Sequence, residues 1–210
     1  MVVSMFITIS RQYAAGASEV SRRVAEELGW KVVDDAFIEE IAARTGYAPE
    51  DIAGLEERVP SFMERFAQSS AISLPENLLS SPSSIDQPDT IKLAHVSREL
   101  VEELGREDRV VLVGRAAAAV LASESSAIHV RLVASVEYRV RQATERLGHS
   151  EKEARAHVAE IDRNRELYHR ELYGRDWNDP VNYHLVLNTE ALGSDGAAQL
   201  IVARARQLGW

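Results

Sequence analysis

The sequence predicts an α/β fold in which a parallel sheet of five strands is covered by helices on both faces. Short apolar runs, each long enough for one strand, alternate with segments in which apolar residues recur at helical spacing. The five runs occupy residues 2–10, 30–33, 109–113, 127–133 and 183–188. Strands that alternate with helices pair in parallel through right-handed crossovers, which places helices on both sides of the sheet. Residues 110–113 are all apolar, so we expect a central strand buried on both faces.

The first strand leads through a loop of small residues into the first helix, within residues 2–29. In this helix an apolar residue recurs every four positions, Ser18 is suited to cap its start, and Gly29 is suited to end it. A strand, a loop of small residues and a helix start together present backbone N–H groups to a phosphate. The residues predicted to bind phosphate are Ser10, Arg11, Ala14, Ala15, Gly16, Ala17 and Ser18.

The same loop has a simpler interpretation, as an ordinary strand-to-helix turn in which small residues allow tight packing. The usual phosphate-loop motif is G-x-x-x-x-G-K-[ST], and Gly16 alone remains of its core. Ala17 stands at the lysine position, so the loop has no lysine there. The motif by itself therefore favours the simpler interpretation.

Composition restricts the classes of function. The chain has 210 residues, of which 45% are hydrophobic, enough for one sizeable core. Its formal net charge of −9 argues against a nucleic-acid partner. Three of its 24 Lys and Arg residues are lysines, and arginine is the side chain that holds phosphate bidentately. Because the chain has no cysteine and no apolar run of membrane-spanning length, we expect a cytoplasmic protein without a membrane partner.

The segments between the strands supply the helices. Helical spacing or capping signals predict helices over residues 37–46, 49–55, 60–66, 90–104, 116–122, 135–147 and 196–208. A further helix opens at Ser150, which forms a capping box with Glu153. Residues 68–89 are rich in serine and proline and sparse in charge, which predicts a loop rather than a core element.

Small and polar residues stand where the predicted strands end. Ligands of parallel α/β sheets bind beyond the carboxyl ends of the strands. At those ends the sequence has Ser10 and Arg11, Asp34 and Asp35, Gly114 and Arg115, Ala134 and Ser135, and Asn188 and Thr189. Nine arginines lie within residues 131–175. Together these features favour a site for an anionic ligand at this edge of the sheet.

Several segments resemble those of the nucleoside monophosphate kinases, and specifically of the cytidylate kinase-like family of bacteria. They are I-T-I-S-R-Q-Y (7–13), W-K-V-V-D-D (30–35), V-L-V-G-R-A (111–116), V-A-S-V-E-Y-R (133–139), E-I-D-R-N-R (160–165), G-R-D-W-N-D-P-V-N-Y (174–183) and L-V-L-N-T (185–189). The resemblance spans nearly the whole chain. No single segment is specific for the family, whereas their order and spacing together are.

The resemblance implies a P-loop kinase fold of the nucleoside monophosphate kinase type. It implies transfer of the γ-phosphoryl group of ATP, with Mg²⁺, to a nucleoside monophosphate, CMP or dCMP in preference. It also implies one kinase-like domain over residues 1–210, with an acceptor-binding arm at about 36–90 and a lid at about 150–180. Nucleotides are the expected partners. The sequence assigns no Mg²⁺ ligands, no other metal site and no oligomeric state.

Roles for single residues also follow from the resemblance. The loop at 10–18 would hold the donor phosphates, Arg115 the phosphate of the acceptor, and Asp34 or Asp35 its sugar or base. The residues placed around the transferring group are Arg139, Arg163 and Arg165, with Asp162 orienting a lid arginine. Arginines suit phosphoryl transfer, which needs alignment, neutralisation of charge and exclusion of water.

Not every arginine of this region is expected to act on phosphate. We interpret Arg141, Arg146 and Arg155 as solvated helix residues in ion pairs. Arg163 and Arg165 cannot point in one direction from a straight helix, so a shared role requires the helix to bend there.

The loop leaves two hypotheses open. Ala14 and Ala17 replace glycines that the family normally keeps, and a Cβ restricts positive φ and close backbone approach. Arg11 is the candidate to supply the charge of the missing lysine. The chain is then either an active kinase or a catalytically impaired nucleotide-binding or interaction protein on the same fold.

Overall fold

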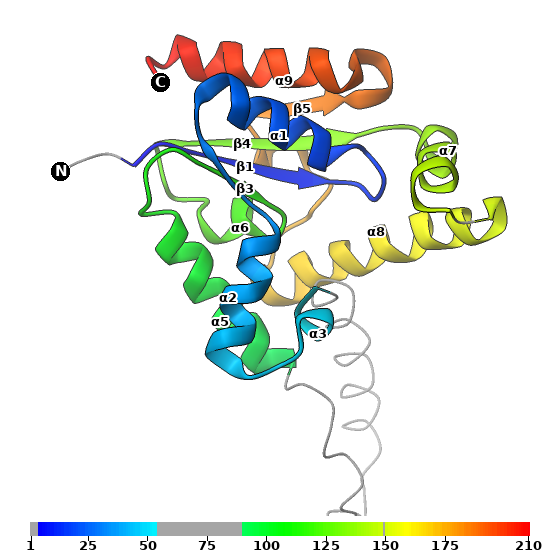
Figure 1. The fold of residues 1–210 in the computed structure, drawn as a ribbon, viewed down its shortest axis with the longest axis horizontal. Helices are drawn as coiled ribbons and strands as arrows, with labels where there is room; N and C mark the ends of the chain where they lie inside the picture. Colours follow the sequence, from blue (N-terminus) through cyan, green and yellow to red (C-terminus); the bar gives the residue numbers. More distant parts are fainter. Residues whose placement is uncertain (1–3, 54–89, 149) are drawn as a thin grey trace, which may run out of the picture.

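A computed structural model describes residues 4–53, 90–148 and 150–210, and these residues contain a five-stranded sheet (Figure 1). The strands are β1 (Phe6–Arg11), β2 (Lys31–Val33), β3 (Val110–Val113), β4 (Ala127–Val133) and β5 (Leu185–Asn188). Their order across the sheet is β2-β3-β1-β4-β5, and every neighbouring pair is parallel. The predicted parallel α/β fold is confirmed.

Helices lie on both faces of the sheet. They are α1 (Ala17–Leu28), α2 (Asp35–Thr45), α3 (Pro49–Ala53), α5 (Thr90–Leu104), α6 (Ala117–Val120), α7 (Val136–Leu147), α8 (Glu151–Tyr173) and α9 (Thr189–Gln207). In Figure 1, α1 and α9 lie above the sheet, and α2, α5 and α6 lie below it. Within the described ranges no helix combines the length and apolar character needed to span a membrane.

The two faces of the sheet form separate cores. In β3, Val110 and Leu112 pack on one face with side chains of α2 and α5, whereas Val111 and Val113 pack on the other with side chains of α1 and α9. Successive side chains of a strand point to opposite faces, so a strand between two helical layers has to be apolar throughout. All four residues are buried, as predicted for residues 110–113.

A third, smaller core joins α7 to α8. Val140 and Ala143 of α7 pack against apolar residues of α8, and Tyr13 and Ala14 of the β1–α1 loop pack onto this cluster. Ser135 caps α7, where its side chain accepts a hydrogen bond from Tyr138 N–H. Ser150 caps α8 and forms the predicted capping box with Glu153. The loop is therefore attached to the α7–α8 end of the molecule.

Some predicted boundaries are wrong for local reasons. Helix α1 begins at Ala17 after a left-handed Gly16, so Ser18 lies inside the first turn and is not the N-cap. Helix α9 begins at Thr189 rather than at residue 196, because the Asn188 side chain accepts from two N–H groups of its first turn. A non-helical Gly193 then kinks this helix and hides its periodicity.

Other elements, the last strand (Leu185–Asn188 instead of 183–188) among them, are shorter than predicted, and some predictions fall outside the described residues. The alanine-rich helix covers Ala117–Val120 instead of 116–122, and the first strand covers Phe6–Arg11 instead of 2–10. The predicted helix at 60–66, the predicted loop at 68–89 and most of the arm at 36–90 lie outside the described residues.

Candidate active site

The β1–α1 loop turns sharply at the carboxyl edge of the sheet. Ala14 has φ 59° and Gly16 has φ 81°, so both lie in the left-handed region. Left-handed residues within a turn are the arrangement by which successive backbone N–H groups form an anion-binding concavity. The side chains of Ala15 and Ala17 are buried against the sheet, so the open side of the loop is lined mainly by backbone.

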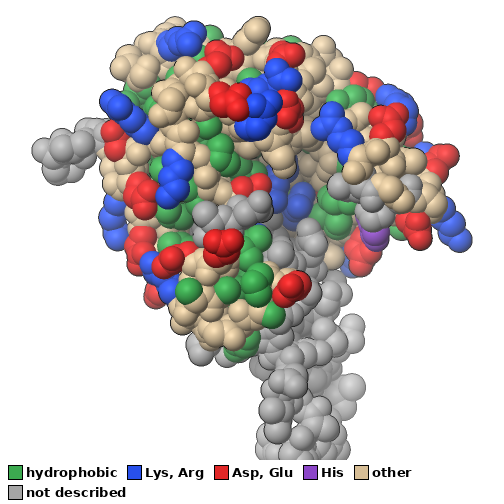
Figure 2. Space-filling model, in the orientation of Figure 1, with side chains coloured by type: hydrophobic (Ala, Val, Ile, Leu, Met, Phe, Trp, Pro, Cys, Tyr) green, Lys and Arg blue, Asp and Glu red, His purple; other side chains and the backbone are tan. Residues whose placement is uncertain are grey.

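A cleft of about 230 Å³ opens in front of this loop. One wall consists of residues 11–19, and the other includes Gln142 and Arg146 of α7 and Arg165 of α8. Figure 2 shows Lys or Arg side chains recessed in the hollow between the main body and the α7–α8 end. The predicted loop residues Arg11, Ala14, Ala15, Gly16, Ala17 and Ser18 all line the cleft.

An ion pair behind the loop holds the Tyr13 peptide groups. Asp162 Oδ1 accepts from Tyr13 N–H at 2.7 Å, and Arg139 Nη1 donates to the Tyr13 carbonyl at 3.3 Å. Arg139 Nη1 also meets Asp162 Oδ2 at 2.6 Å, and Nε donates to the Ala134 carbonyl at 3.1 Å. With 4% of its side chain exposed, Arg139 is committed to the loop backbone. This geometry makes Arg139 and Asp162 positioning residues for the loop.

Arg163 and Arg165 lie on different faces of α8. Arg165 is buried and its Nη1 donates to the Arg11 carbonyl at 3.2 Å, at the end of β1. Arg163 is exposed and does not line the loop cleft. Helix α8 is one continuous helix from Glu151 to Tyr173, so the bend that a shared role requires is not present in the structure.

The Arg11 side chain crosses from β1 to the end of β3. A Cβ at Gly114 would collide with the Arg11 guanidinium, so the two are in direct contact. After β3 the chain has three successive left-handed residues, Gly114 (φ 73°), Arg115 (φ 55°) and Ala116 (φ 50°). Left-handed backbone is costly outside glycine, and such residues concentrate at functional sites.

Arg115 connects the end of β3 to the start of the proposed arm. Its side chain is buried, and Nη1 donates to the Ile52 carbonyl of α3 at 3.2 Å. Asp34 follows the neighbouring strand β2 and is half-buried at the N-cap position of α2. Asp35 is the first residue of α2, and its side chain lies outside the described part of the structure.

Ser10 forms a hydrogen bond with Trp177, in the segment that follows α8. Its Oγ accepts from the Trp177 indole N–H at 2.9 Å, and both residues are buried. The Arg131 guanidinium lies 3.9 Å from the Trp177 ring and donates to Asn178 at 2.8 Å. Burial lowers the pKa of Arg131 below its usual value. The sequence did not predict the contact of Trp177 with Ser10 or its contact with Arg131, because Trp177 lies far from both residues in the chain.

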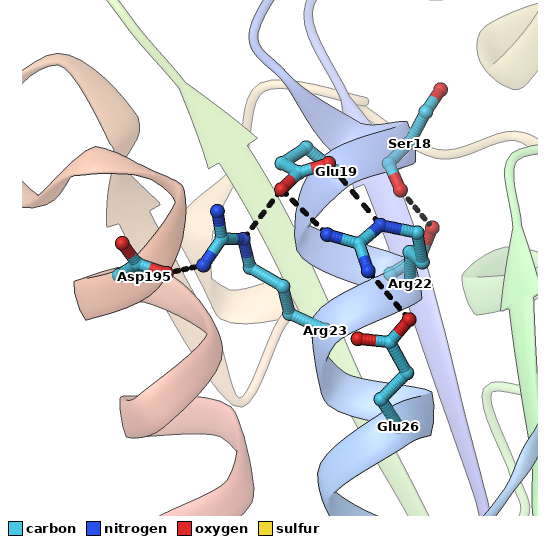
Figure 3. A network of polar contacts seen from close by, with 7 residues as sticks. Ser18, Glu19, Arg22, Arg23, Glu26 and Asp195 are labelled. Atoms are coloured by element: carbon cyan, nitrogen blue, oxygen red, sulfur yellow. Dashed lines mark hydrogen bonds and ion pairs between the residues drawn. The ribbon is translucent and has the colours of Figure 1, made fainter.

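Glu19, in the first turn of α1, belongs to the network of polar contacts drawn in Figure 3. It accepts from Arg22 at 2.8 Å and from Arg23 at 2.6 Å, and Arg23 also pairs with Asp195 of α9. The hydrogen bonds from Arg22 and then Arg23 lower the pKa of Glu19 to about 2. An ionised carboxylate with two guanidinium partners therefore follows Ser18, the residue at the hydroxyl position of the usual motif.

A sequence model of the cytidylate kinase-like family matches residues 6–191, which is most of the chain. The protein belongs to the cytidylate kinase-like family. A curated protein named cytidylate kinase, from Methanopyrus kandleri, is 26% identical over 96% of this chain and 93% of its own length.

Solved structures agree in fold with this member of the cytidylate kinase-like family. An uncharacterised protein from Eubacterium ventriosum superposes with a TM-score of 0.67 at 17% identity, over 96% of this chain and 98% of that chain. A shikimate kinase from Bacteroides thetaiotaomicron gives 0.54 at 13% identity, over 97% of both chains. At these identities the similarity shows the P-loop kinase fold and nothing of the substrate.

The cytidylate kinase-like chain brings most of the predicted site residues to one edge of the sheet. The loop, Arg11 and Arg165 line one cleft, with Arg139 and Asp162 behind the loop, and Arg115 follows β3 at the same edge. Arg163 does not line the cleft. Arg146 and Gln142 were not predicted. Their four-residue spacing on α7 places them on one helix face, but that spacing alone does not show what the face meets. Among the described residues, no group of three or more His, Cys, Asp or Glu could hold a metal ion.

Proposed function

We propose that this member of the cytidylate kinase-like family transfers the γ-phosphoryl group of ATP to a nucleoside monophosphate, with CMP or dCMP as the acceptor. The observation that carries the proposal is the position of Arg11. It lines the loop cleft and also contacts Gly114, next to Arg115. One guanidinium thus lies between a loop suited to donor phosphates and an arginine suited to the acceptor. The name of the Methanopyrus kandleri relative supports the choice of a cytidine nucleotide.

The proposed reaction uses few protein groups. An oxygen of the acceptor phosphate attacks the γ-phosphorus of ATP, and the bond from that phosphorus to the β–γ bridging oxygen breaks. The bridging oxygen keeps the electron pair, so ADP and a nucleoside diphosphate are formed. Loop N–H groups hold the donor, Arg115 orients the acceptor, and Arg11 and Arg165 neutralise charge between them. Such a transfer depends on positioning and charge stabilisation rather than on covalent catalysis.

The proposal includes Mg²⁺, an acceptor-binding arm and a lid. Mg²⁺ keeps several waters and binds mainly to substrate phosphates, so it needs few protein ligands. Glu19 is engaged by Arg22 and Arg23, and we assign no protein ligand to the ion. Residues of about 36–90 form the acceptor arm in this proposal, Asp34 and Asp35 lie just before it, and residues of about 150–180 form the lid.

A second hypothesis is a nucleotide-binding protein with impaired catalysis. It is favoured by one observation, the buried methyl group of Ala17 at the place of the usual lysine. Without that cation the loop can bind a nucleotide weakly and fail to stabilise the transferring group.

A coupled assay of the full chain with ATP, Mg²⁺ and single monophosphates separates the two hypotheses. We expect phosphorylation of CMP or dCMP at about 1–100 per second, the ordinary range for kinases, and slower turnover of UMP and AMP. ATP binding in calorimetry without turnover of any monophosphate would favour the impaired protein. If the protein shows no ATP binding and no turnover, both hypotheses fail, and only the family and the fold remain.

The acceptor role is tested by a matched pair of variants that flank β3 (Val110–Val113) at its two ends. Arg115→Ala should raise the KM for the monophosphate about tenfold or more, because a hydrogen-bonded guanidinium is lost from a charged ligand. Arg109→Ala removes the same charge from the opposite, exposed end of β3 and should leave that KM unchanged. Equal KM values in the two variants would contradict the role of Arg115.

A further inference from the structure

We infer that Arg146 of α7 binds the donor phosphates, assisted by Gln142, and supplies the cation that Ala17 cannot. The inference deepens the proposed function, on which it rests for the identity of the donor. It replaces the expectation that Arg11 fills the place of the lysine, because the Arg11 guanidinium lies over Gly114 on the β3 side.

The position of Arg146 is the first argument. It lies on the α7 wall of the loop cleft, and the other wall is formed by the loop residues that surround Ala17. Gln142 lies four residues earlier, which is one helical turn, and lines the same cleft. Two side chains that carry N–H donors thus face the loop from one helix face.

The other arginines of α7 and of the neighbouring part of α8 are already engaged. Arg139 pairs with Asp162, Arg141 lies 3.8 Å from Glu190, and Arg155 lies 3.4 Å from Glu137. Arg146 was expected to be a solvated residue in an ion pair. In the described part of the chain it forms no hydrogen bond or ion pair. Glu19 also lines the cleft, but its carboxylate is paired with Arg22 and Arg23.

The attachment of α7 to the loop is the second argument. Tyr13 and Ala14 of the loop pack on the core formed by Val140, Ala143 and two residues of α8. The distance between the loop and α7 is therefore set by buried contacts and not by a flexible linker. A planar guanidinium held at that distance can meet two phosphate oxygens at once, which a lysine in the loop itself does as a point charge.

The alternative is that Arg146 only stabilises its own helix. It stands in the last turn of α7, where a cation interacts favourably with the helix dipole. That role changes the stability of the protein when Arg146 is removed, and it leaves nucleotide affinity unchanged. The two roles therefore differ in a binding measurement.

The test is isothermal titration calorimetry of the full chain with ATP, inorganic tripolyphosphate and CMP. Arg146→Ala should weaken ATP and tripolyphosphate binding by about tenfold to a hundredfold, the range for hydrogen bonds to a charged group. Arg146→Lys should recover part of the loss, and CMP affinity should stay at the wild-type value. The matched control is Arg141→Ala, which removes the same charge from the same helix outside the loop cleft.

Equal ATP affinities in Arg146→Ala and Arg141→Ala, both with a wild-type melting temperature, would overturn the inference. Turnover distinguishes this failure from failure of the proposed function. If wild type phosphorylates CMP and Arg146→Ala keeps its donor KM, the inference fails and the kinase assignment stands. If the wild-type protein binds ATP but phosphorylates no monophosphate, and the Arg146→Ala variant no longer binds ATP, the inference stands and the kinase assignment fails. Wild type that binds neither ATP nor tripolyphosphate overturns both.

Discussion

Single residues of the β1–α1 loop show how alanine replaces glycine in a phosphate-loop position. Ala14 has φ 59°, a backbone region that costs an L-residue about 1–2 kcal/mol. Its side chain packs on the α7–α8 core, and this contact offsets part of the strain. The loop thus keeps the left-handed turn that glycine makes easily, at the expense of stability.

We expect Ala14→Gly to leave stability unchanged or to raise it by up to about 1 kcal/mol. Relief of the left-handed strain outweighs the added entropy of a glycine in the unfolded chain, which is about 0.5–1 kcal/mol. The control is Ala15→Gly, which removes a buried methyl group from a residue without positive φ and should destabilise the protein. Urea unfolding of both variants measures the difference. An equal loss in both would show that the Ala14 methyl contact outweighs its strain.

At the scale of elements, the loop, α7 and α8 act as one unit through the Arg139–Asp162 pair. The pair joins the two helices; Asp162 accepts from the Tyr13 N–H, and Arg139 donates to the Tyr13 carbonyl. A buried pair contributes little compared with apolar packing, but removal of one partner leaves an uncompensated charge. The pair therefore matters most for holding the loop in one conformation.

Asp162→Ala should destabilise the protein by about 3–5 kcal/mol, because Arg139 is left buried without its partner. The control is Glu137→Ala, which breaks an exposed pair with Arg155 and should change stability by about 0.5 kcal/mol or less. Denaturant unfolding with intrinsic fluorescence measures both. A small effect of Asp162→Ala would mean that water reaches Arg139 and that the pair does not fix the loop.

At the scale of the whole molecule, His129 links three strands on the lower face of the sheet. Its Nδ1 lies 2.8 Å from Thr8 Oγ1 of β1, and its ring stacks on His184, just before β5, with centroids 5.1 Å apart. Its backbone N–H donates to His184 Nδ1 at 2.8 Å. Burial, then the charges of His184 and Arg175, lower the pKa of His129 from 6.5 to about 4.

This shift makes stability depend on pH in a defined window. Between pH 6.5 and about 4 the unfolded chain binds a proton at His129 and the native chain does not, so stability falls as pH falls. The full loss is about 3 kcal/mol, at 1.36 kcal/mol per pKa unit. Urea unfolding at pH 7, 6 and 5 should show a steeper loss for wild type than for His129→Gln. The control is His95→Gln, at an exposed histidine. If the free energy of unfolding of His129→Gln falls with pH as steeply as that of wild type, the prediction is contradicted.

The sequence by itself determined the parallel α/β fold, the central buried strand and the loop of small residues between the first strand and the first helix. Short stretches of sequence are enough to predict these features, because apolar runs, helical spacing and caps such as Ser135 and Ser150 depend on neighbouring residues only. The end of α1 at Gly29 is of the same kind. The start of α9 is also set locally, by the Asn188 cap, but Gly193 interrupts the helical spacing that would show it.

Only the tertiary structure decided what each arginine does. The sequence gives Arg139, Arg146, Arg163 and Arg165 one charge and one chemistry, and helical spacing alone does not say what a helix face meets. Packing of α7 and α8 around Tyr13 turns Arg139 toward Asp162 and leaves Arg146 facing the cleft. A continuous α8 buries Arg165 and exposes Arg163. The role of a long charged side chain depends on partners far away in the chain, and only the folded structure fixes those partners.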